Sequence, residues 1–110
     1  MSLDPAPGTV AVVFVALADP SRRQVIGVLA ARGSATATTV AEELAITRQA
    51  VSKHLATLGD AGLVDAQRAG REGRYRLRPA PLRRAARWLD ASAGAGDDRL
   101  AAVQDAAERG

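Results

Sequence analysis

AITRQAVSKHLATL, residues 45–58, has the most informative pattern of apolar and polar residues in this chain. On a helix its apolar residues recur at i, i+4 and i+7 and share one face, formed by Val51, Leu55 and Leu58. The opposite face consists of short side chains and one lysine: Gln49, Ser52, Lys53 and Ala56. Side chains that donate and accept hydrogen bonds suit the base edges of a DNA major groove. We therefore interpret the segment as a recognition helix.

The residues that precede this helix predict a second helix and a tight turn. Thr39-Val40-Ala41-Glu42 fits a capping box, in which the threonine hydroxyl and the glutamate carboxylate bind free backbone amides reciprocally. The helix that begins there is expected to end near Leu44, and Thr47 then caps the recognition helix. Residues 39–58 therefore have the spacing of a helix-turn-helix.

The N-terminal part of the chain contains three distinct segments. Residues 1–8 hold two prolines and a glycine without periodicity, which predicts a flexible leader. The sequence VAVVFVALA, residues 10–18, is apolar all round, and both a buried strand and a covered helix at a subunit interface fit it. Asp19 followed by Pro20 then predicts a capped helix that stops at Gly33.

Residues 63–78 predict a β-hairpin. Two short extended runs, residues 63–67 and 74–78, flank the turn sequence AGREG at residues 69–73. On the second run Tyr75 and Leu77 alternate with arginines, so we expect these two residues to pack inward and the arginines to face out. A hairpin of this kind beside a helix-turn-helix is a wing.

Positive charge is concentrated in the wing and in the residues that follow it. The formal net charge of the chain is only +3, but eight arginines between residues 68 and 87 are opposed by Glu72 alone. A basic cluster taken by itself is as readily a solvated surface as a binding surface. Directly after a candidate recognition helix, the cluster favours contact with phosphates.

The last predicted helix, residues 81–108, carries an apolar seam. Its apolar and small residues recur at alternating spacings of four and three: Leu82, Ala86, Leu89, Ala93, Gly96, Leu100, Val103 and Ala107. This pattern is typical of a helix that pairs with another helix. The seam runs through Gly94 and Gly96, so one long helix and two helices hinged at the glycines both remain open.

Together these segments predict a mainly α chain with a small β-hairpin, a winged helix-turn-helix domain over residues 9–110. Residues 10–18 and 81–108 are its expected dimerisation helices. The length of 110 residues is that of one domain. The absence of cysteine excludes disulfides and thiolate metal sites and favours a reducing cytoplasm. Residues 10–18 are too short to cross a bilayer, so we expect no membrane partner.

From Leu17 to about Leu89 the chain resembles the ArsR/SmtB family of winged-helix repressors. The matching features are ALADPSRRQVIGVL, TVAEELAITRQAVSKHLATLGDAGLV and the wing ending RYRL. The resemblance implies a homodimeric transcriptional repressor whose first and last helices form the interface. It also implies that the two recognition helices enter successive major grooves of double-stranded DNA at an inverted repeat.

The resemblance and the helical face described above give candidate contact residues. Base contacts are assigned to Arg48, Gln49, Ser52 and Lys53. Contacts to the DNA backbone are assigned to Thr47, His54, Arg68, Arg71, Arg74 and Arg76. The dimer interface is assigned to Val10, Val13, Phe14, Leu17, Leu82, Ala86, Leu89, Ala93, Leu100 and Val103.

The chain departs from the metal-responsive members of that family. It has no cysteine, and its single histidine is His54, whereas soft divalent metals need several nitrogen or sulfur ligands that converge on one point. We therefore expect no metal and no cofactor. Control by an organic effector, by a partner protein or by the concentration of the repressor itself stays open.

Other functional classes fit the sequence less well. Ser52 and His54 diverge by about 200° on a helix and form no nucleophile–base pair, so we expect no enzyme. A protein-interaction module with vestigial DNA binding has no need of an arginine-dense wing. RNA-binding modules usually present aromatic platforms, and the aromatic residues here are only Phe14, Tyr75 and Trp88. Trp88 either lines an effector pocket between the terminal helices or fills the core.

Overall fold

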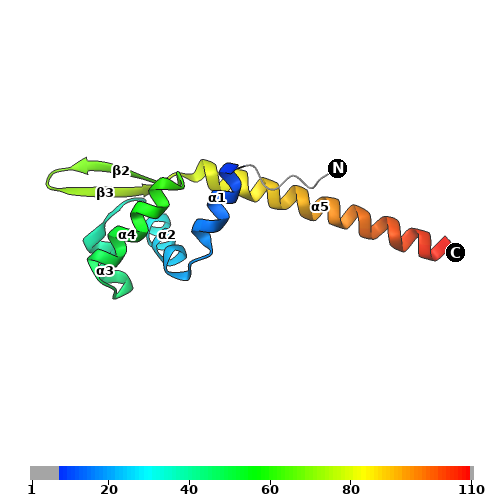
Figure 1. Ribbon diagram of the computed structural model, residues 1–110, viewed down its shortest axis with the longest axis horizontal. Helices are drawn as coiled ribbons and strands as arrows, with labels where there is room; N and C mark the ends of the chain where they lie inside the picture. The colour runs from blue at the N-terminus through cyan, green and yellow to red at the C-terminus, as the bar shows by residue number, and fades with distance from the viewer. Residues whose placement is uncertain (1–7, 110) are drawn as a thin grey trace.

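A computed structural model describes residues 8–109, which form five helices and three strands. The helices are α1 (Gly8–Leu17), α2 (Pro20–Arg32), α3 (Ala37–Leu44), α4 (Arg48–Asp60) and α5 (Pro79–Arg109). The strands are β1 (Ala35–Thr36), β2 (Val64–Ala69) and β3 (Glu72–Leu77). Helices α1 to α4 and the sheet gather at one end, and α5 projects from them as a long arm (Figure 1). The molecule therefore measures 70 × 25 × 20 Å.

Helix α1 resolves the alternative left open for residues 10–18, which are helical up to Leu17. Gly8 is already helical, and residues 1–7 of the expected leader lie outside the described residues. Val10, Val13 and Ala16 are buried in the core of the chain, whereas Val12 and Val15 are 45% and 70% exposed. The helix is apolar on both faces, and its own chain covers only one of them.

Helix α2 begins and ends as expected. The carboxylate of Asp19 accepts a hydrogen bond of 2.7 Å from the backbone amide of Ser21, and Pro20 occupies the first helical position. Gly33 ends the helix with a φ of +81°, a conformation that costs glycine little. Val25 and Leu29 point into the core.

Helix α3 begins earlier than expected, so the predicted capping box at Thr39 is wrong. Thr36 is the cap, because its hydroxyl accepts a hydrogen bond of 3.2 Å from the amide of Thr39. The reason lies in the sheet, where Ala35 pairs with Tyr75 and Thr36 with Arg74. This pairing keeps the chain extended as far as Thr36. Strand β1 itself was not predicted.

The helix-turn-helix forms as the sequence indicates. Ala45 adopts a left-handed φ of 55° between α3 and α4. The hydroxyl of Thr47 then caps α4 by accepting a hydrogen bond of 3.1 Å from the amide of Ala50. One face of α4 is buried against Val40 and other core residues, through Val51, Leu55 and Leu58.

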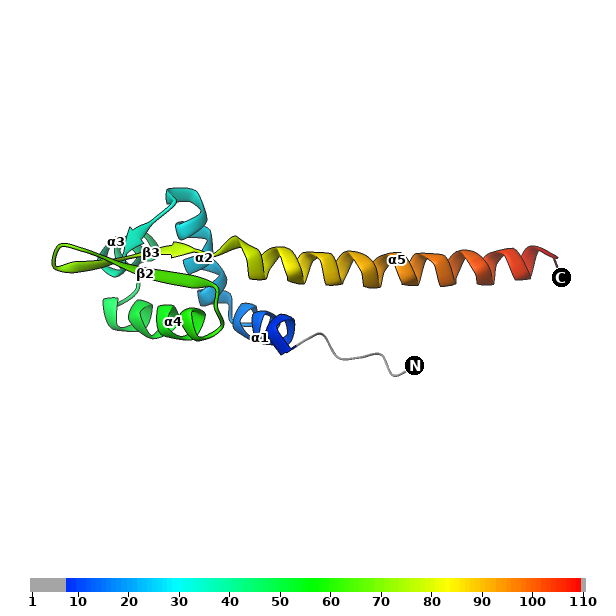
Figure 2. The same cartoon turned by 90° about the horizontal axis from the view of Figure 1, so that it is seen from above.

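The wing is the antiparallel hairpin of β2 and β3, in a sheet of order β1-β3-β2 (Figure 2). Ala69 pairs with Glu72, so the turn is shorter than the predicted residues 69–73 and consists of Gly70 and Arg71. The φ of +70° at Gly70 is what a tight hairpin turn requires at its first central residue. Tyr75 and Leu77 face the core, as expected, and the arginines that alternate with them, Arg74, Arg76 and Arg78, are exposed.

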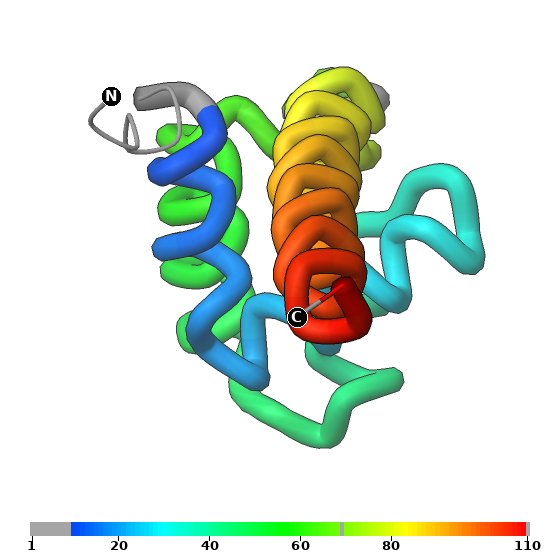
Figure 3. The backbone as a smooth tube through the Cα atoms, turned by 90° about the vertical axis from the view of Figure 1, so that its right-hand side faces the viewer, coloured from blue at the N-terminus to red at the C-terminus, as the bar shows by residue number. Residues whose placement is uncertain are grey.

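Helix α5 starts at Pro79, two residues before the predicted start, and continues through Gly94 and Gly96 without interruption. Its first turns pack beside α1, as the view along the helix shows (Figure 3). The predicted mainly α fold with a winged helix-turn-helix is confirmed. Within residues 8–109 the structure has no helix with both the length and the hydropathy to cross a membrane.

Candidate DNA-binding surface

The candidate base-reading residues lie on the first two turns of α4. Arg48, Gln49, Ser52 and Lys53 are all exposed. They lie opposite or beside the buried face of the helix, which anchors α4 through three aliphatic residues. The arrangement leaves polar side chains free to approach the edges of base pairs, and in helix-turn-helix proteins it is this end of the recognition helix that reaches them.

Two of the residues predicted to contact the DNA backbone, Thr47 and His54, belong to α4 or its cap, whereas the others lie on the wing. Thr47 is exposed but uses its hydroxyl to cap α4. His54 is half-buried and lies next to the buried Leu55 in the sequence of α4. The pKa of Asp19 is lowered mainly by the hydrogen bond from the amide of Ser21. Burial opposes that effect, and the amide and charge of Arg22 and the charge of His54 lower the pKa further.

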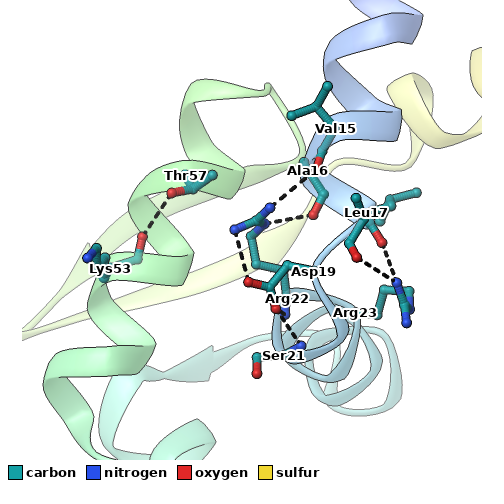
Figure 4. A network of polar contacts seen from close by, with 10 residues as sticks. Val15, Ala16, Leu17, Asp19, Ser21, Arg22, Arg23, Lys53 and Thr57 are labelled. Atoms are coloured by element: carbon teal, nitrogen blue, oxygen red, sulfur yellow. Dashed lines mark hydrogen bonds and ion pairs between the residues drawn. The ribbon is translucent and has the colours of Figure 1, made fainter.

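Arginines join α1 to α2 close to the recognition helix (Figure 4). The guanidinium of Arg22 donates hydrogen bonds to the carbonyls of Ala16, at 2.7 Å, and Val15, at 3.2 Å. Arg23 donates in the same way to the carbonyl of Leu17, at 2.7 Å. These carbonyls end α1 and have no partner within that helix. The two arginines therefore tie the end of α1 to the start of α2.

The arginines of the wing fall into two groups. Arg68 and Arg71 are exposed near the hairpin tip and make no hydrogen bond or ion pair through their side chains within residues 8–109. Arg76 and Arg78 lie 4.0 and 3.9 Å from the carboxylate of Asp65. Because both pairs are exposed, these contacts are weak and leave the guanidinium groups able to exchange partners.

Arg74 is engaged within the chain, which the sequence did not indicate. Its Nε donates to the hydroxyl of Ser34 at 3.2 Å, and a terminal nitrogen donates to the carbonyl of Ser34 at 3.4 Å. On the same strand, Glu72 lies 3.5 Å from the hydroxyl of Thr38. These contacts brace the wing against the residues around β1. Among the wing arginines predicted to contact the DNA backbone, Arg74 is therefore the one whose guanidinium hydrogen-bonds to its own chain within residues 8–109.

The residues predicted to form the dimer interface differ in burial: some are buried, some partly buried and some exposed. Val10 and Val13 are buried in the core of their own chain, so the expectation that they face a partner is wrong. Phe14, Leu17 and Leu82 are partly buried against the same core. The remaining residues are exposed on α5: Ala86, Leu89, Ala93, Leu100 and Val103.

The exposed face of α1 was not predicted from the sequence. Val12 and Val15 are the exposed large apolar residues of this helix. A helix without a polar face gives no local sign of which side its own chain will cover, because the pattern carries no period. The exposed apolar surface of α1 is therefore formed by these two valines.

The described residues, 8–109, contain no group of three or more His, Cys, Asp or Glu side chains that could hold a metal ion. Trp88 packs against Phe14 beside the core. Past this residue, the surface of α5 is hollowed over about 330 Å³ on the side of Trp88 and Ser92.

A short exposed polar helix face, a helix-turn-helix and an arginine-bearing hairpin define a winged helix-turn-helix domain. Residues 17–67 match a family model described as a helix-turn-helix domain. The chain is 32% identical over 88 residues to the transcriptional repressor SdpR of Bacillus subtilis strain 168, a match that covers 80% of this chain and 97% of that repressor.

Solved structures agree with this match. An ArsR-like transcriptional regulator from Rhodococcus sp. RHA1 superposes with a TM-score of 0.79 and 39% identity, covering 88% of this chain and 91% of that one. A homodimeric winged helix-turn-helix DNA-binding domain from Mycobacterium bovis, described as a possible ArsR-family regulator, has a TM-score of 0.60 and 29% identity. That match covers 84% of this chain and 82% of the Mycobacterium domain. This chain belongs to the ArsR family of transcriptional regulators.

Proposed function

We propose that this regulator is a homodimeric repressor that binds double-stranded DNA at an inverted repeat. Each subunit places α4 in a major groove and rests its wing on the neighbouring backbone. The homodimeric state of the similar Mycobacterium bovis domain supports the assembly. A regulator of this kind acts on the chromosome, so we expect it in the cytoplasm, and no catalytic step is needed for its function.

The proposal rests on the relative position of two exposed surfaces, the start of α4 and the tip of the wing. The start of α4 and the tip of the β2–β3 hairpin lie at the same end of the molecule, away from the end of α5 (Figure 2). Gln49 and Lys53 are exposed on α4, and Arg68 and Arg71 are exposed on the wing. Polar side chains for base edges and guanidinium groups for phosphates are thus presented together.

Selection from a pool of random duplexes tests the proposal directly. The purified chain is expected to enrich an inverted repeat whose half-sites are about one helical turn apart, because each half-site receives one recognition helix. Enrichment of a single unrepeated site would contradict the dimeric arrangement. Preference for a structured RNA of matched length, or enrichment of no sequence, would contradict the function as a whole.

We also propose that DNA binding does not respond to thiophilic metals. The chain has no cysteine and one histidine, and a metal site for soft cations needs several such ligands. Titration of the complex with the selected duplex is expected to show unchanged affinity at one equivalent of zinc, cadmium or arsenite. Loss of affinity at that level, without aggregation, would reveal a site built from carboxylates.

A further inference from the structure

A hollow of about 330 Å³ lies at the C-terminal end of α4, where residues of α1, of the loop after α4, of the end of β3 and of the start of α5 meet. We call it the α4–α5 hollow. Small-molecule sites in proteins have volumes of about 300–1,000 Å³. Helix α4 has 13 residues, so about 18 Å of helix separate the hollow from Arg48. This end of α4 lies near α1 and away from the wing tip (Figure 2). The hollow is therefore separate from the candidate base-reading residues.

Three of the residues that line the hollow are apolar. Val12 on α1 is 45% exposed, Ala61 is half-buried, and Pro81 is buried in the first turn of α5. Gly62 keeps the space between them open, because a Cβ atom at this position would meet no other atom within 4 Å. Its φ of +77° also favours glycine. The apolar part of a small molecule would therefore find a surface that the chain itself leaves uncovered.

The hydrogen-bond donors left for a ligand are guanidinium groups. The backbone amides of Ala61, Gly62 and Arg78 already donate to carbonyls of the same chain. Pro81 has no amide hydrogen. The side chains of Arg78 and Arg84 are the cationic groups of the lining. Recognition of a polar ligand in the hollow therefore falls to these two arginines.

Both arginines are able to accept a new partner. The Nε of Arg78 lies 3.9 Å from the carboxylate of Asp65, an exposed and therefore weak pair. The side chain of Arg84 makes no hydrogen bond or ion pair within residues 8–109. The remaining charged residue of the lining is Asp60, the last residue of α4. Two guanidinium groups and one carboxylate give the lining a formal charge of +1, which a single negative charge would balance.

We propose that the α4–α5 hollow is a binding site for a small organic monocarboxylate with an apolar body. The carboxylate accepts hydrogen bonds from Arg78 and Arg84, because a guanidinium matches the two oxygens of a carboxylate. The apolar body lies against Val12 and Pro81. Asp60 disfavours a ligand with a second negative charge.

The position of the site gives it a regulatory consequence, which rests on the proposed DNA-binding function. Asp60 ends the recognition helix, whereas Val12 belongs to α1 and Arg84 to α5. A ligand held between these residues restrains α4 relative to the two terminal helices. Coupling between two binding sites typically changes affinity by about 5–150-fold, and we expect occupation of the hollow to change the affinity for DNA within this range.

Nuclear magnetic resonance of the full chain, titrated with 2-naphthoate, tests the site without DNA. The backbone amide signals of Ala61 and Gly62 are expected to shift in a saturable way. The neutral analogue 2-naphthamide has the same ring system and is expected to leave them unchanged. Equal shifts with 2-naphthamide, equal shifts with inorganic phosphate, or no saturable shift with 2-naphthoate would each overturn the proposal.

A pair of arginine variants tests the residues that hold the carboxylate. Arg84→Ala is expected to raise the dissociation constant of 2-naphthoate at least about tenfold, the usual effect of losing a hydrogen bond to a charged group. Arg87→Ala is the matched control, because Arg87 is an exposed arginine one turn further along α5 that does not line the hollow. Its dissociation constant should stay that of the natural chain. Equal weakening by both variants would indicate general attraction to a basic surface and contradict a built site.

Titration of the selected duplex with and without saturating 2-naphthoate separates the site from its consequence. An unchanged affinity for DNA would contradict the coupling and leave the binding site in place. Failure of the unliganded chain to bind any duplex would contradict the proposed function, whereas the resonance shifts would still decide whether the hollow binds a carboxylate.

Discussion

The ring of Phe14 on α1 meets the indole of Trp88 on α5 in an edge-to-face arrangement, with ring centroids 5.6 Å apart and planes inclined by 62°. This contact joins the first and last helices within one chain. Because α1 is also tied to α2 by Arg22 and Arg23, the three helices form one continuous unit. The position of α1 and α5 is thereby linked to that of α2, which packs against α3 and α4.

Phe14→Leu is expected to lower the free energy of unfolding by about 0.5–1.5 kcal/mol, the usual contribution of an aromatic pair beyond its buried area. Leucine keeps most of the apolar volume, so α1 should remain helical. Denaturant unfolding followed by circular dichroism measures the change. An unchanged midpoint would show that the ring contact does not stabilise the α1–α5 junction.

Val13 and Val15 are two residues apart on α1 and are expected to respond oppositely to the same change. Val13 is fully buried, so Val13→Asp places an unpaired charge in the core at a cost of several kcal/mol and unfolds the chain. Val15 is 70% exposed, so Val15→Asp should leave the helical content intact and weaken dimerisation. Circular dichroism and sedimentation of both variants distinguish these effects. A folded, fully dimeric Val15→Asp variant would exclude the outer face of α1 from the interface.

Gln49→Ala is expected to reduce discrimination between the selected duplex and a scrambled one. A side chain that reads a base through two hydrogen bonds contributes about 1–3 kcal/mol of discrimination, and Gln49 is exposed on the first turn of α4. Titrations of both duplexes give the ratio of affinities. Equal weakening of both would assign Gln49 to the DNA backbone instead.

Alanine variants of Arg71 and Arg74 are expected to behave differently. Arg71 is proposed to contact phosphates, whereas Arg74 holds the wing against Ser34. Arg71→Ala should weaken binding to both duplexes and flatten the salt dependence by about one unit for each lost phosphate contact. Arg74→Ala should keep the salt slope, because that guanidinium is bound to Ser34, and should speed amide hydrogen exchange in β3. A reduced salt slope with unchanged exchange in Arg74→Ala would restore Arg74 as a phosphate contact.

The elements with strong local signals could be predicted from the sequence. The period of α4, the cap at Thr47 and the Asp19-Pro20 start of α2 each depend on neighbouring residues alone. The cap of α3 could not be chosen in this way, because Thr36 and Thr39 are both good caps. The choice is made by the pairing of β1 with β3, which joins residues about 40 positions apart.

The candidate site was predictable to the same extent. The exposed face of α4 followed from helical geometry, and the structure presents those residues to solvent. The engagement of Arg74 by Ser34 was not predictable, since it depends on the fold bringing distant segments together. The inward position of Val10 and Val13 could likewise not be predicted, because residues 10–18 are all apolar and give no period.

The dimeric reading of an inverted repeat is tested by comparing the selected repeat with a duplex that keeps one half-site and scrambles the other. We expect two chains to bind the intact repeat together. Since each mismatched base pair costs about 1–3 kcal/mol, loss of one half-site should weaken binding at least about a hundredfold. Binding of the half-site duplex by one chain with the same affinity as the full repeat would contradict a dimer that reads both halves.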